Sequence, residues 1–525
     1  MALQFFKYPL LLILIGCCFQ VNAQQMNISL ARPYTQEVER YVLGDSTMYF
    51  HQAAKPYLES DLDVSKVYLL AKDSIKIYYP GVGKFYKHHL LSIRKDDFFL
   101  AADPLFDFTI GKDFADTTSY AGKQLFTNQR GLQFIGDIGK QFSFQTCLYE
   151  TQNFVPLYLK HFVDSMGTFP GFGRVKAYNL NGYDFAMANG WISYSPAKWL
   201  NLQFGQGKHI FGHGYRSILL SDAAFSYPYL KARLSSPDHR WQYTAMYASL
   251  QTLERLPLLE VPEAIFKRKG GSFHYLSWLP TRKIEIGLFE GIIWERYDST
   301  GTIPQPYGAY IPVFGVNTML QGFDGVNHVM LGMNARIQVG KHNCIYGQVA
   351  TDHISRGQIG YQLGYKHFDL LVKNLDVQLE WNNLGGNMYA QSEPLQSYSH
   401  VNQPLGHPTG PATDELMVMA NYRYKRLITH IKYNSIFHSL GPDGSWKSDP
   451  EITFTNIAAW PTRQVSQLDF QFGINFNPVT NFQIIAGYTS RTEKIDYNWT
   501  ADQNMKTSYL YISLRTNLIN RYSDF

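Results

Sequence analysis

A period of two in hydrophobicity, repeated along residues 96 to 525, constrains the fold of this chain more than any other feature. In residues 467 to 476 one parity is apolar and consists of Leu468, Phe470, Phe472, Ile474 and Phe476. The other parity is polar or small and consists of Gln467, Asp469, Gln471, Gly473 and Asn475. Because successive side chains point to opposite faces of a β-strand, this segment is predicted to form a strand with one apolar and one polar face.

The polar parity carries charges in several of these segments. Residues 328 to 338 and 376 to 382 repeat the pattern with Arg336, Asp376 and Glu380 on the polar side. A ring of such strands, with apolar side chains outside and charged side chains inside, fits lipid around a hydrated lumen. The alternation therefore favours a membrane barrel over a soluble β-sandwich.

Composition agrees with a barrel and disfavours a helical membrane protein. The chain is 15% aromatic and 17% charged, and after residue 23 it has no uninterrupted run of 18 apolar residues. Its last residue, Phe525, is the terminal aromatic typical of bacterial outer-membrane barrels. The sequence predicts an all-β fold, a transmembrane antiparallel β-barrel of about 18 strands in the outer membrane with long loops at the cell surface.

The expected strands follow one another along the second part of the chain. They cover residues 98–111, 131–137, 141–150, 185–195, 200–206, 227–234, 241–250, 270–279, 283–295, 328–339, 343–352, 357–367, 375–383, 415–425, 427–437, 465–477, 480–491 and 507–518. Short turns, such as 138 to 140 and 340 to 342, alternate with long loops, such as 151 to 184 and 384 to 414. Short turns are expected in the periplasm and long loops outside the cell, so both termini are predicted to be periplasmic.

The first residues are interpreted as an export signal. Residues 1 to 23 combine Lys7, an apolar core and a small-residue cleavage site that ends at Ala23. An alternative cleavage before Cys17 would leave a lipidated cysteine. In both cases the protein is predicted to leave the cytoplasm.

Residues 24 to 95 do not alternate and are predicted to form a small, partly helical plug segment in the periplasm. Thr35 is expected to cap a short helix, and residues 50 to 58 are expected to form one or two helical turns. The barrel is then expected to occupy residues 96 to 525.

Charge and cysteine content exclude several classes of partner and cofactor. The formal net charge is only +5 and no basic block stands out, so we expect no nucleic-acid partner. Cys147 and Cys344 lie far apart on separate expected strands, which gives neither a disulfide framework nor a zinc motif. We therefore expect no cofactor and no bound metal.

One charged residue breaks the alternation. Glu290 shares its parity with Ile284, Ile286 and Leu288, so a regular strand would turn it toward lipid. A charge in the middle of the membrane costs a few kcal/mol. We therefore predict a β-bulge that shifts the register before Glu290.

The densest cluster of reactive residue types lies between residues 204 and 224. It contains four glycines, two histidines and the candidate site residues His213, Arg216 and Asp222. A hydrolase that uses Ser221 is disfavoured because no nucleophile elbow is present. We expect a structural hairpin folded into the lumen, in which Arg216 holds a glycan group or a carboxylate such as that of Asp222 or Glu380.

The loop at residues 384 to 414 is predicted to offer a surface for sugars. Aromatic rings can cover the apolar faces of sugar rings, and amides and imidazoles can hydrogen-bond hydroxyl groups. The candidate residues are Tyr389, Tyr398, His400, Asn402 and Gln403.

Two blocks of sequence resemble a known family. The first runs from Gly207 to Asp222 and the second from Trp381 to Pro408. These blocks resemble the Wzi-type capsule assembly family, and more closely its Bacteroidetes members similar to the gliding motility protein RemB. The resemblance implies an 18-stranded barrel with a periplasmic helical plug, and it implies polysaccharide retention at the cell surface or a role in gliding.

These observations favour a non-enzymatic barrel that binds or anchors surface polysaccharide, or that supports gliding motility and surface adhesion. The alternative is a porin-like outer-membrane channel for small solutes. The expected partners are outer-membrane lipid, surface polysaccharide and gliding or secretion machinery proteins.

Overall fold

The structure is a computed structural model of the chain. It describes residues 25–45, 47–63, 67, 80–118, 120, 123–256, 266–298, 301–302, 307–323, 327–353, 357–391, 394–440, 461–497, 503–516 and 518–525. The proposed signal peptide and Cys17 therefore lie outside the described residues.

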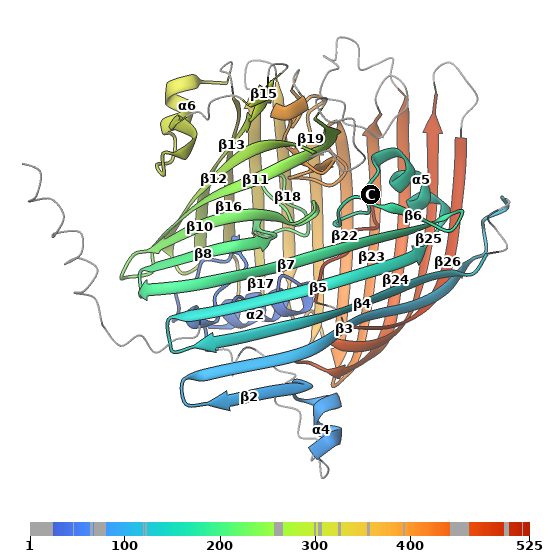
Figure 1. Ribbon diagram of the computed structural model, residues 1–525, viewed down its shortest axis with the longest axis horizontal. Helices are drawn as coiled ribbons and strands as arrows, with labels where there is room; N and C mark the ends of the chain where they lie inside the picture. The colour runs from blue at the N-terminus through green and yellow to red at the C-terminus, as the bar shows by residue number, and fades with distance from the viewer. Residues whose placement is uncertain are drawn as a thin grey trace, which may run out of the picture.

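Within the described residues, eighteen long strands form a closed antiparallel barrel (Figure 1). They are β3 (Phe98–Asp113), β4 (Leu125–Ile138), β5 (Phe142–Phe154), β7 (Gly182–Ala197), β8 (Leu200–Gly207), β10 (Tyr227–Ser235), β11 (Trp241–Arg255), β12 (Phe266–Thr281), β13 (Ile284–Glu295), β16 (His328–Gln338), β17 (Asn343–His353), β18 (Gln358–His367), β19 (Leu375–Leu384), β22 (Thr413–Tyr424), β23 (Leu427–Ser439), β24 (Thr462–Asn477), β25 (Phe482–Asp496) and β26 (Gln503–Thr516). The barrel closes where β26 pairs with β3, with Leu514 opposite Phe108.

Shorter elements lie beside or inside this wall. The short strands are β1 (Ala54–Lys55), β2 (Leu91–Lys95), β6 (Lys176–Tyr178), β9 (Ile210–Phe211), β14 (Tyr297–Asp298), β15 (Gly301–Thr302), β20 (Ser399–His400) and β21 (Gln403–Pro404). The helices are α2 (Arg32–Gly44), η1 (Glu59–Asp61), α4 (Pro80–Tyr86), α5 (Leu157–Met166), η3 (Tyr307–Tyr310), α6 (Val316–Gln321) and η5 (Pro394–Gln396). Among the described helices, none is long and apolar enough to cross a bilayer.

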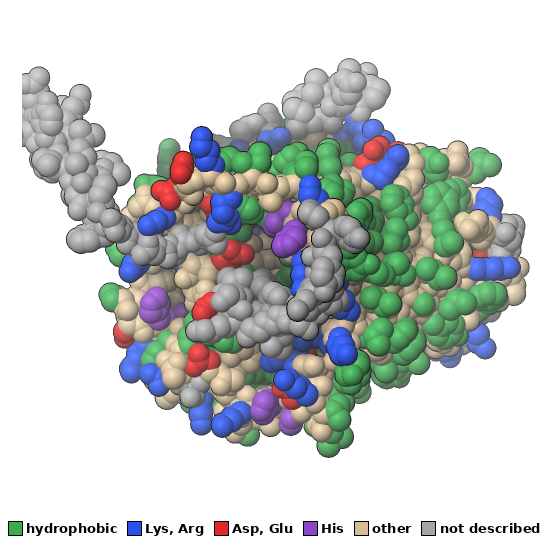
Figure 2. Space-filling view, turned by 90° about the horizontal axis from the view of Figure 1, so that it is seen from below, with side chains coloured by type: hydrophobic (Ala, Val, Ile, Leu, Met, Phe, Trp, Pro, Cys, Tyr) green, Lys and Arg blue, Asp and Glu red, His purple; other side chains and the backbone are tan. Residues whose placement is uncertain are grey.

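The strand count and the two faces predicted from the alternation are confirmed. Leu468, Phe470 and Phe472 on β24 are each more than 40% exposed, whereas Gln467 is fully buried. Figure 2 shows hydrophobic side chains gathered along the side wall, with charged side chains and histidines around the end of the barrel. The outer face is therefore the apolar surface that lipid contact requires.

Several strands extend further than predicted. β4 begins at Leu125 rather than at residue 131, and β11 continues to Arg255 rather than to residue 250. In the first part of β4 the outward residues include Asn128 and Arg130, so hydrophobicity no longer alternates. Strand pairing continues there because backbone hydrogen bonds do not depend on an apolar outer face.

The N-terminal segment lies inside the short-turn end of the barrel. The Tyr34 hydroxyl donates to the Pro478 carbonyl at 2.9 Å, and Arg40 forms an ion pair with Asp369 at 2.7 Å. Both partners belong to short turns between strands, and Figure 1 shows α2 within the barrel at this level.

Two local predictions for this segment are wrong. Thr35 does not cap the helix: α2 begins at Arg32, and the Thr35 hydroxyl donates to the Arg32 carbonyl within the first turn. Residues 50 to 58 form no helical turn, because Ala54 and Lys55 pair as strand β1 with β9. Tertiary pairing with a distant segment overrides the local preference there.

The predicted bulge before Glu290 is also absent. β13 pairs with β16 in unbroken register from Ile284 to Ile293, so Glu290 keeps its outward parity. Its carboxylate accepts the backbone N–H groups of Gly315 at 2.8 Å and Thr318 at 3.2 Å. The segment that contains α6 folds over the outer wall (Figure 1) and buries Glu290 completely.

The C-terminal residue does not end a strand. β26 ends at Thr516, and residues 518 to 525, here called the tail, turn into the lumen (Figure 1). Phe525 is 2% exposed and packs on Phe162 of α5, with 4.3 Å between ring centroids. The terminal aromatic thus belongs to an internal core rather than to the membrane-facing end of the last strand.

Candidate functional site

The signature segment, residues 208 to 226, crosses the lumen and carries the site that the sequence singled out. Two of its glycines are required by their surroundings. Gly212 has φ +153°, and a Cβ there would lie 2.3 Å from the Gln348 amide nitrogen. A Cβ on Gly214 would lie 2.5 Å from the Arg216 carbonyl and 2.7 Å from a Glu380 carboxylate oxygen. The backbone therefore fits against the inner wall only without side chains.

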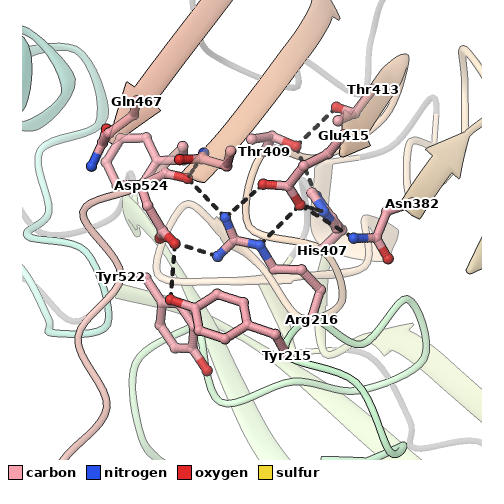
Figure 3. A network of polar contacts seen from close by, with 12 residues as sticks. Tyr215, Arg216, Asn382, His407, Thr409, Thr413, Glu415, Gln467, Tyr522 and Asp524 are labelled. Carbon is pink, nitrogen blue, oxygen red and sulfur yellow. Dashed lines mark hydrogen bonds and ion pairs between the residues drawn. The ribbon is translucent and has the colours of Figure 1, made fainter. Parts of the chain in front are cut away.

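Arg216 lies at the centre of a buried ionic network (Figure 3). Its Nη2 and Nε donate to the two Glu415 carboxylate oxygens at 2.8 Å and 3.1 Å, a bidentate pair. Its Nη1 donates to Asp524 Oδ1 at 3.2 Å. All three side chains are fully buried. In this structure the Arg216 side chain contacts the carboxylates of Glu415 and Asp524 rather than those of Asp222 or Glu380.

Further contacts neutralise and complete this network. Glu380 instead accepts the backbone N–H of Arg216 at 2.9 Å, and Lys432 Nζ lies 2.7 Å from Asp524 Oδ2. His407 Nε2 lies 2.8 Å from Glu415 Oε2. Although burial acts to raise it, the neighbouring Arg216 and Lys432 charges hold the pKa of the Asp524 carboxyl well below its ordinary value.

The other two candidates of the signature segment lie apart from Arg216. Asp222 accepts hydrogen bonds from the Asn520 amide, at 2.8 Å, and from the Tyr522 hydroxyl, both on the tail. The His213 ring lies 3.7 Å from Glu285, and burial lowers the pKa of His213 well below its ordinary value. These residues do not form one catalytic cluster. Ser221 instead donates its hydroxyl to the Gly406 carbonyl.

The loop candidates pack onto the signature segment. The Tyr389 and Tyr398 hydroxyls each donate at 2.7 Å, to the carbonyls of Ile218 and Leu219. Their rings are stacked, with centroids 5.5 Å apart. The two blocks that carry the family resemblance are therefore in direct contact inside the barrel.

The remaining loop candidates hold neighbouring backbone. The Gln403 side chain donates to the Phe172 carbonyl and accepts from the Gly171 N–H, and Asn402 donates to the Met166 carbonyl. His400 Nδ1 lies 3.1 Å from the Gln251 N–H, and burial lowers the pKa of His400 to about 3. The expected exposed sugar surface is not present, because Tyr389, Tyr398, His400 and Gln403 are all buried.

A cavity that the sequence did not predict lies beside the tail. Its volume is about 340 Å³ and its walls come from β3 to β5, β22 to β26, α5 and the tail. Five cationic side chains line it, Arg32, Arg423, Lys432, Arg515 and Arg521, but only two carboxylates, Asp107 and Asp469. We call it the tail cavity. The parity of Arg515 on β26 is the sequence signal that points to it.

Comparison with known proteins identifies relatives in fold only. No family model and no curated protein sequence matches the chain. One similar solved structure is described as Wzi, an outer membrane protein involved in group 1 capsule assembly in Escherichia coli and a carbohydrate-binding β-barrel. Its TM-score is 0.55 at 12% identity, covering 93% of this chain and 99% of that chain.

Two further solved structures show a weaker similarity. OprD from Pseudomonas aeruginosa has a TM-score of 0.42 at 10% identity, covering 79% of this chain and 94% of that chain. OccAB4 from Acinetobacter baumannii has a TM-score of 0.42 at 8% identity, with 80% and 98% covered. The predicted likeness to Wzi is confirmed at the level of the barrel fold, whereas closeness to RemB-like members stays a prediction.

Proposed function

We propose that this protein is a non-enzymatic barrel of the bacterial outer membrane that binds surface polysaccharide and holds it at the cell. The observation that carries the proposal is the filled lumen. The N-terminal segment, the signature segment, the loop at residues 384 to 412 and the tail all fold inward and bond to one another. A barrel filled in this way is suited to binding rather than to steady flow of solutes.

The described wall and loops also supply groups that suit a glycan. The tail cavity combines two tyrosine rings, Tyr509 and Tyr511, with amide side chains such as Gln129 and Gln471. Aromatic faces and amides are the groups that recognise sugar rings and their hydroxyls. The carbohydrate-binding barrel with the same fold supports the same reading.

The test compares cells with and without the gene. We expect deletion to release polysaccharide from the cell surface into the medium, and we expect the purified barrel to show no steady conductance in a planar bilayer. Unchanged retention of polysaccharide would refute the proposal. The proposal extends to a role in gliding motility or adhesion, with gliding or secretion machinery proteins as partners. This extension rests on sequence resemblance alone.

A channel is the second candidate, and one observation favours it. The tail cavity and a second cavity of about 450 Å³ are both lined by Ile519 and Asn520 of the tail. Removal of residues 518 to 525 would join the two cavities. If the protein is a channel, the truncated barrel should show a stable conductance and the full-length chain should open transiently. A truncated barrel that stays closed argues for binding alone.

A further inference from the structure

The tail cavity contains cations that the protein itself leaves unpaired. Arg515 projects from β26 and donates only to the Gln471 amide oxygen, at 3.1 Å, while its Nε has no partner in the structure. Among the described residues, Arg515 forms no ion pair with a carboxylate. The cavity therefore presents a guanidinium without the counter-charge that buried arginines ordinarily have.

The nearest acidic neighbour in the strand register cannot serve Arg515. Asp107 lies opposite Arg515 across β26 and β3, but its carboxylate is already engaged. It forms an ion pair with Arg521 of the tail and accepts hydrogen bonds from the Thr109 and Ser513 hydroxyls. Arg515 is thus left for a carboxylate that comes from outside the protein.

A second guanidinium in the same cavity is also without a carboxylate. Arg32 of α2 donates to the Tyr215 carbonyl and lies over the Tyr215 ring, with 3.6 Å from guanidinium carbon to ring centroid. No described carboxylate forms an ion pair with it. The other three cations of the lining, Arg423, Lys432 and Arg521, pair with Glu37, Asp524 and Asp107, so Arg32 and Arg515 are the two that no described carboxylate neutralises.

Neutral groups around the cations fit a sugar ring. Tyr509 and Tyr511 lie on the same face of β26 as Arg515, and their rings are stacked with centroids 5.1 Å apart. Three buried side-chain amide oxygens of the lining, on Asn153, Asn475 and Gln483, have no hydrogen-bond partner in the structure. The volume falls at the lower end of the range of about 300 to 1,000 Å³ typical of small-ligand sites.

We propose that the tail cavity binds a carboxylate-bearing sugar residue, such as a uronate, with the carboxylate on Arg515 and the sugar ring against Tyr509 and Tyr511. The guanidinium is suited to this role because it can donate two parallel hydrogen bonds to a carboxylate. This inference rests on the proposed function and specifies the chemical class of glycan that the barrel takes.

The experiment uses the full chain, purified in detergent, with sodium glucuronate and methyl glucoside as charged and neutral probes in calorimetric titrations. We expect glucuronate to bind and methyl glucoside to bind at least tenfold more weakly, with an affinity for glucuronate that falls as salt rises. Equal binding of both probes, or no binding of glucuronate, overturns the inference. This comparison needs no variant.

Variants then locate the site. Arg515→Gln is expected to weaken glucuronate binding about tenfold or more and to leave methyl glucoside unaffected, whereas Arg515→Lys retains part of the affinity. Lys506→Gln, on the exposed outer face of the same strand, is the matched control. Glucuronate binding that is unchanged in Arg515→Gln refutes the assignment to this cavity.

The cell experiment separates the two proposals. If gene deletion releases surface polysaccharide but glucuronate does not bind, the proposed function stands and the acidic-sugar site fails. If glucuronate binds through Arg515 but deletion leaves polysaccharide in place, the site stands and the proposed function fails.

Discussion

Two arginines inside the barrel show how differently the same residue is used. Arg216 donates to two fully buried carboxylates, Glu415 and Asp524, and the network around it is completed by Lys432. Arg515 lines a cavity, donates to a single neutral amide and has an unpartnered Nε. The charge of Arg216 is neutralised by carboxylates of the protein, whereas the guanidinium of Arg515 is available to a ligand. Both side chains lie in the same lumen.

The difference has an energetic consequence. Removing one member of a buried ionic network leaves its partners charged and desolvated, which costs about 3–5 kcal/mol. Removing a cation that has no ion-pair partner leaves no buried carboxylate without its counter-charge. Loss of stability should therefore follow changes around Arg216, and loss of binding should follow changes around Arg515.

Arg216→Ala is predicted to have the largest effect on stability. It leaves Glu415 and Asp524 buried without a guanidinium, so we expect the free energy of unfolding to fall by about 3–5 kcal/mol. Arg515→Ala serves as the matched variant and should retain the folded yield. Heat-modifiable electrophoretic mobility measures the folded yield of both variants, and thermal unfolding in detergent measures their stability. Equal losses of stability in the two variants would contradict the proposed difference between Arg216 and Arg515.

Phe525→Ala is predicted to come next, because the ring fills a core next to the network. The side chain is 2% exposed and packs on Phe162, so truncation should cost about 3–5 kcal/mol if the cavity cannot collapse. Insertion into the membrane should persist, because β26 ends at Thr516 and contains no part of the tail. Folded protein at normal thermal stability, or a complete failure of insertion, would contradict this account of the terminal aromatic.

Gly212→Val and Gly214→Val test whether the signature segment must fit closely against the wall. The added side chains meet Gln348, Glu380 and the backbone, and Gly212 also has an unfavourable φ for valine, so we expect a loss of about 1–3 kcal/mol for each. Gly44→Ala is the control, because a Cβ there meets nothing within 4 Å. Thermal unfolding of the three variants checks the prediction; a stable Gly212→Val variant would show that the segment can move.

The smallest expected effect is a pH dependence that separates His400 from the ionic network. His400 has a pKa of about 3 in the folded protein against 6.5 ordinarily, so its contribution is complete above pH 6.5 and is lost as pH falls toward 3. Between pH 6.5 and 5.5 we expect a loss of about 1 kcal/mol. The Asp524 pKa is lowered, so that carboxylate stays charged in this window.

His400→Gln should make the slope of the thermal midpoint against pH shallower by this share, whereas buried His213, whose pKa is also lowered, keeps a slope of its own. Arg515→Gln should leave the slope unchanged. A slope that is the same in His400→Gln as in the unaltered protein would show that His400 does not contribute to the acid sensitivity.

Much of the barrel was predictable from local pattern. The alternation around Leu468 and Phe470 determines both the strand and the face that it turns to lipid. Successive side chains of a strand point to opposite faces, so the apolar residues of this pattern all lie on one face. The same parity placed Arg336 and Glu380 in the lumen. The pattern failed at Asn128 and Arg130, where the strand continues beyond the apolar band.

The candidate site was predictable only in part. The sequence singled out Arg216 and the loop with Tyr389 and Tyr398, and it expected an inward hairpin. It did not predict Glu415 or Asp524 as partners. Glu415 has the lumen parity of β22, but nothing local relates it to Arg216, which lies 199 residues earlier.

What the sequence by itself determined is the wall: the number of strands, their order and the face that each turns to lipid. Tertiary structure alone decided the interior. The burial of Tyr389 and Tyr398, the inward path of the tail and the cover over Glu290 depend on segments far apart in the chain. The physical reason is that strand periodicity is a property of neighbouring residues, whereas charge compensation in a closed lumen depends on which distant side chains meet there.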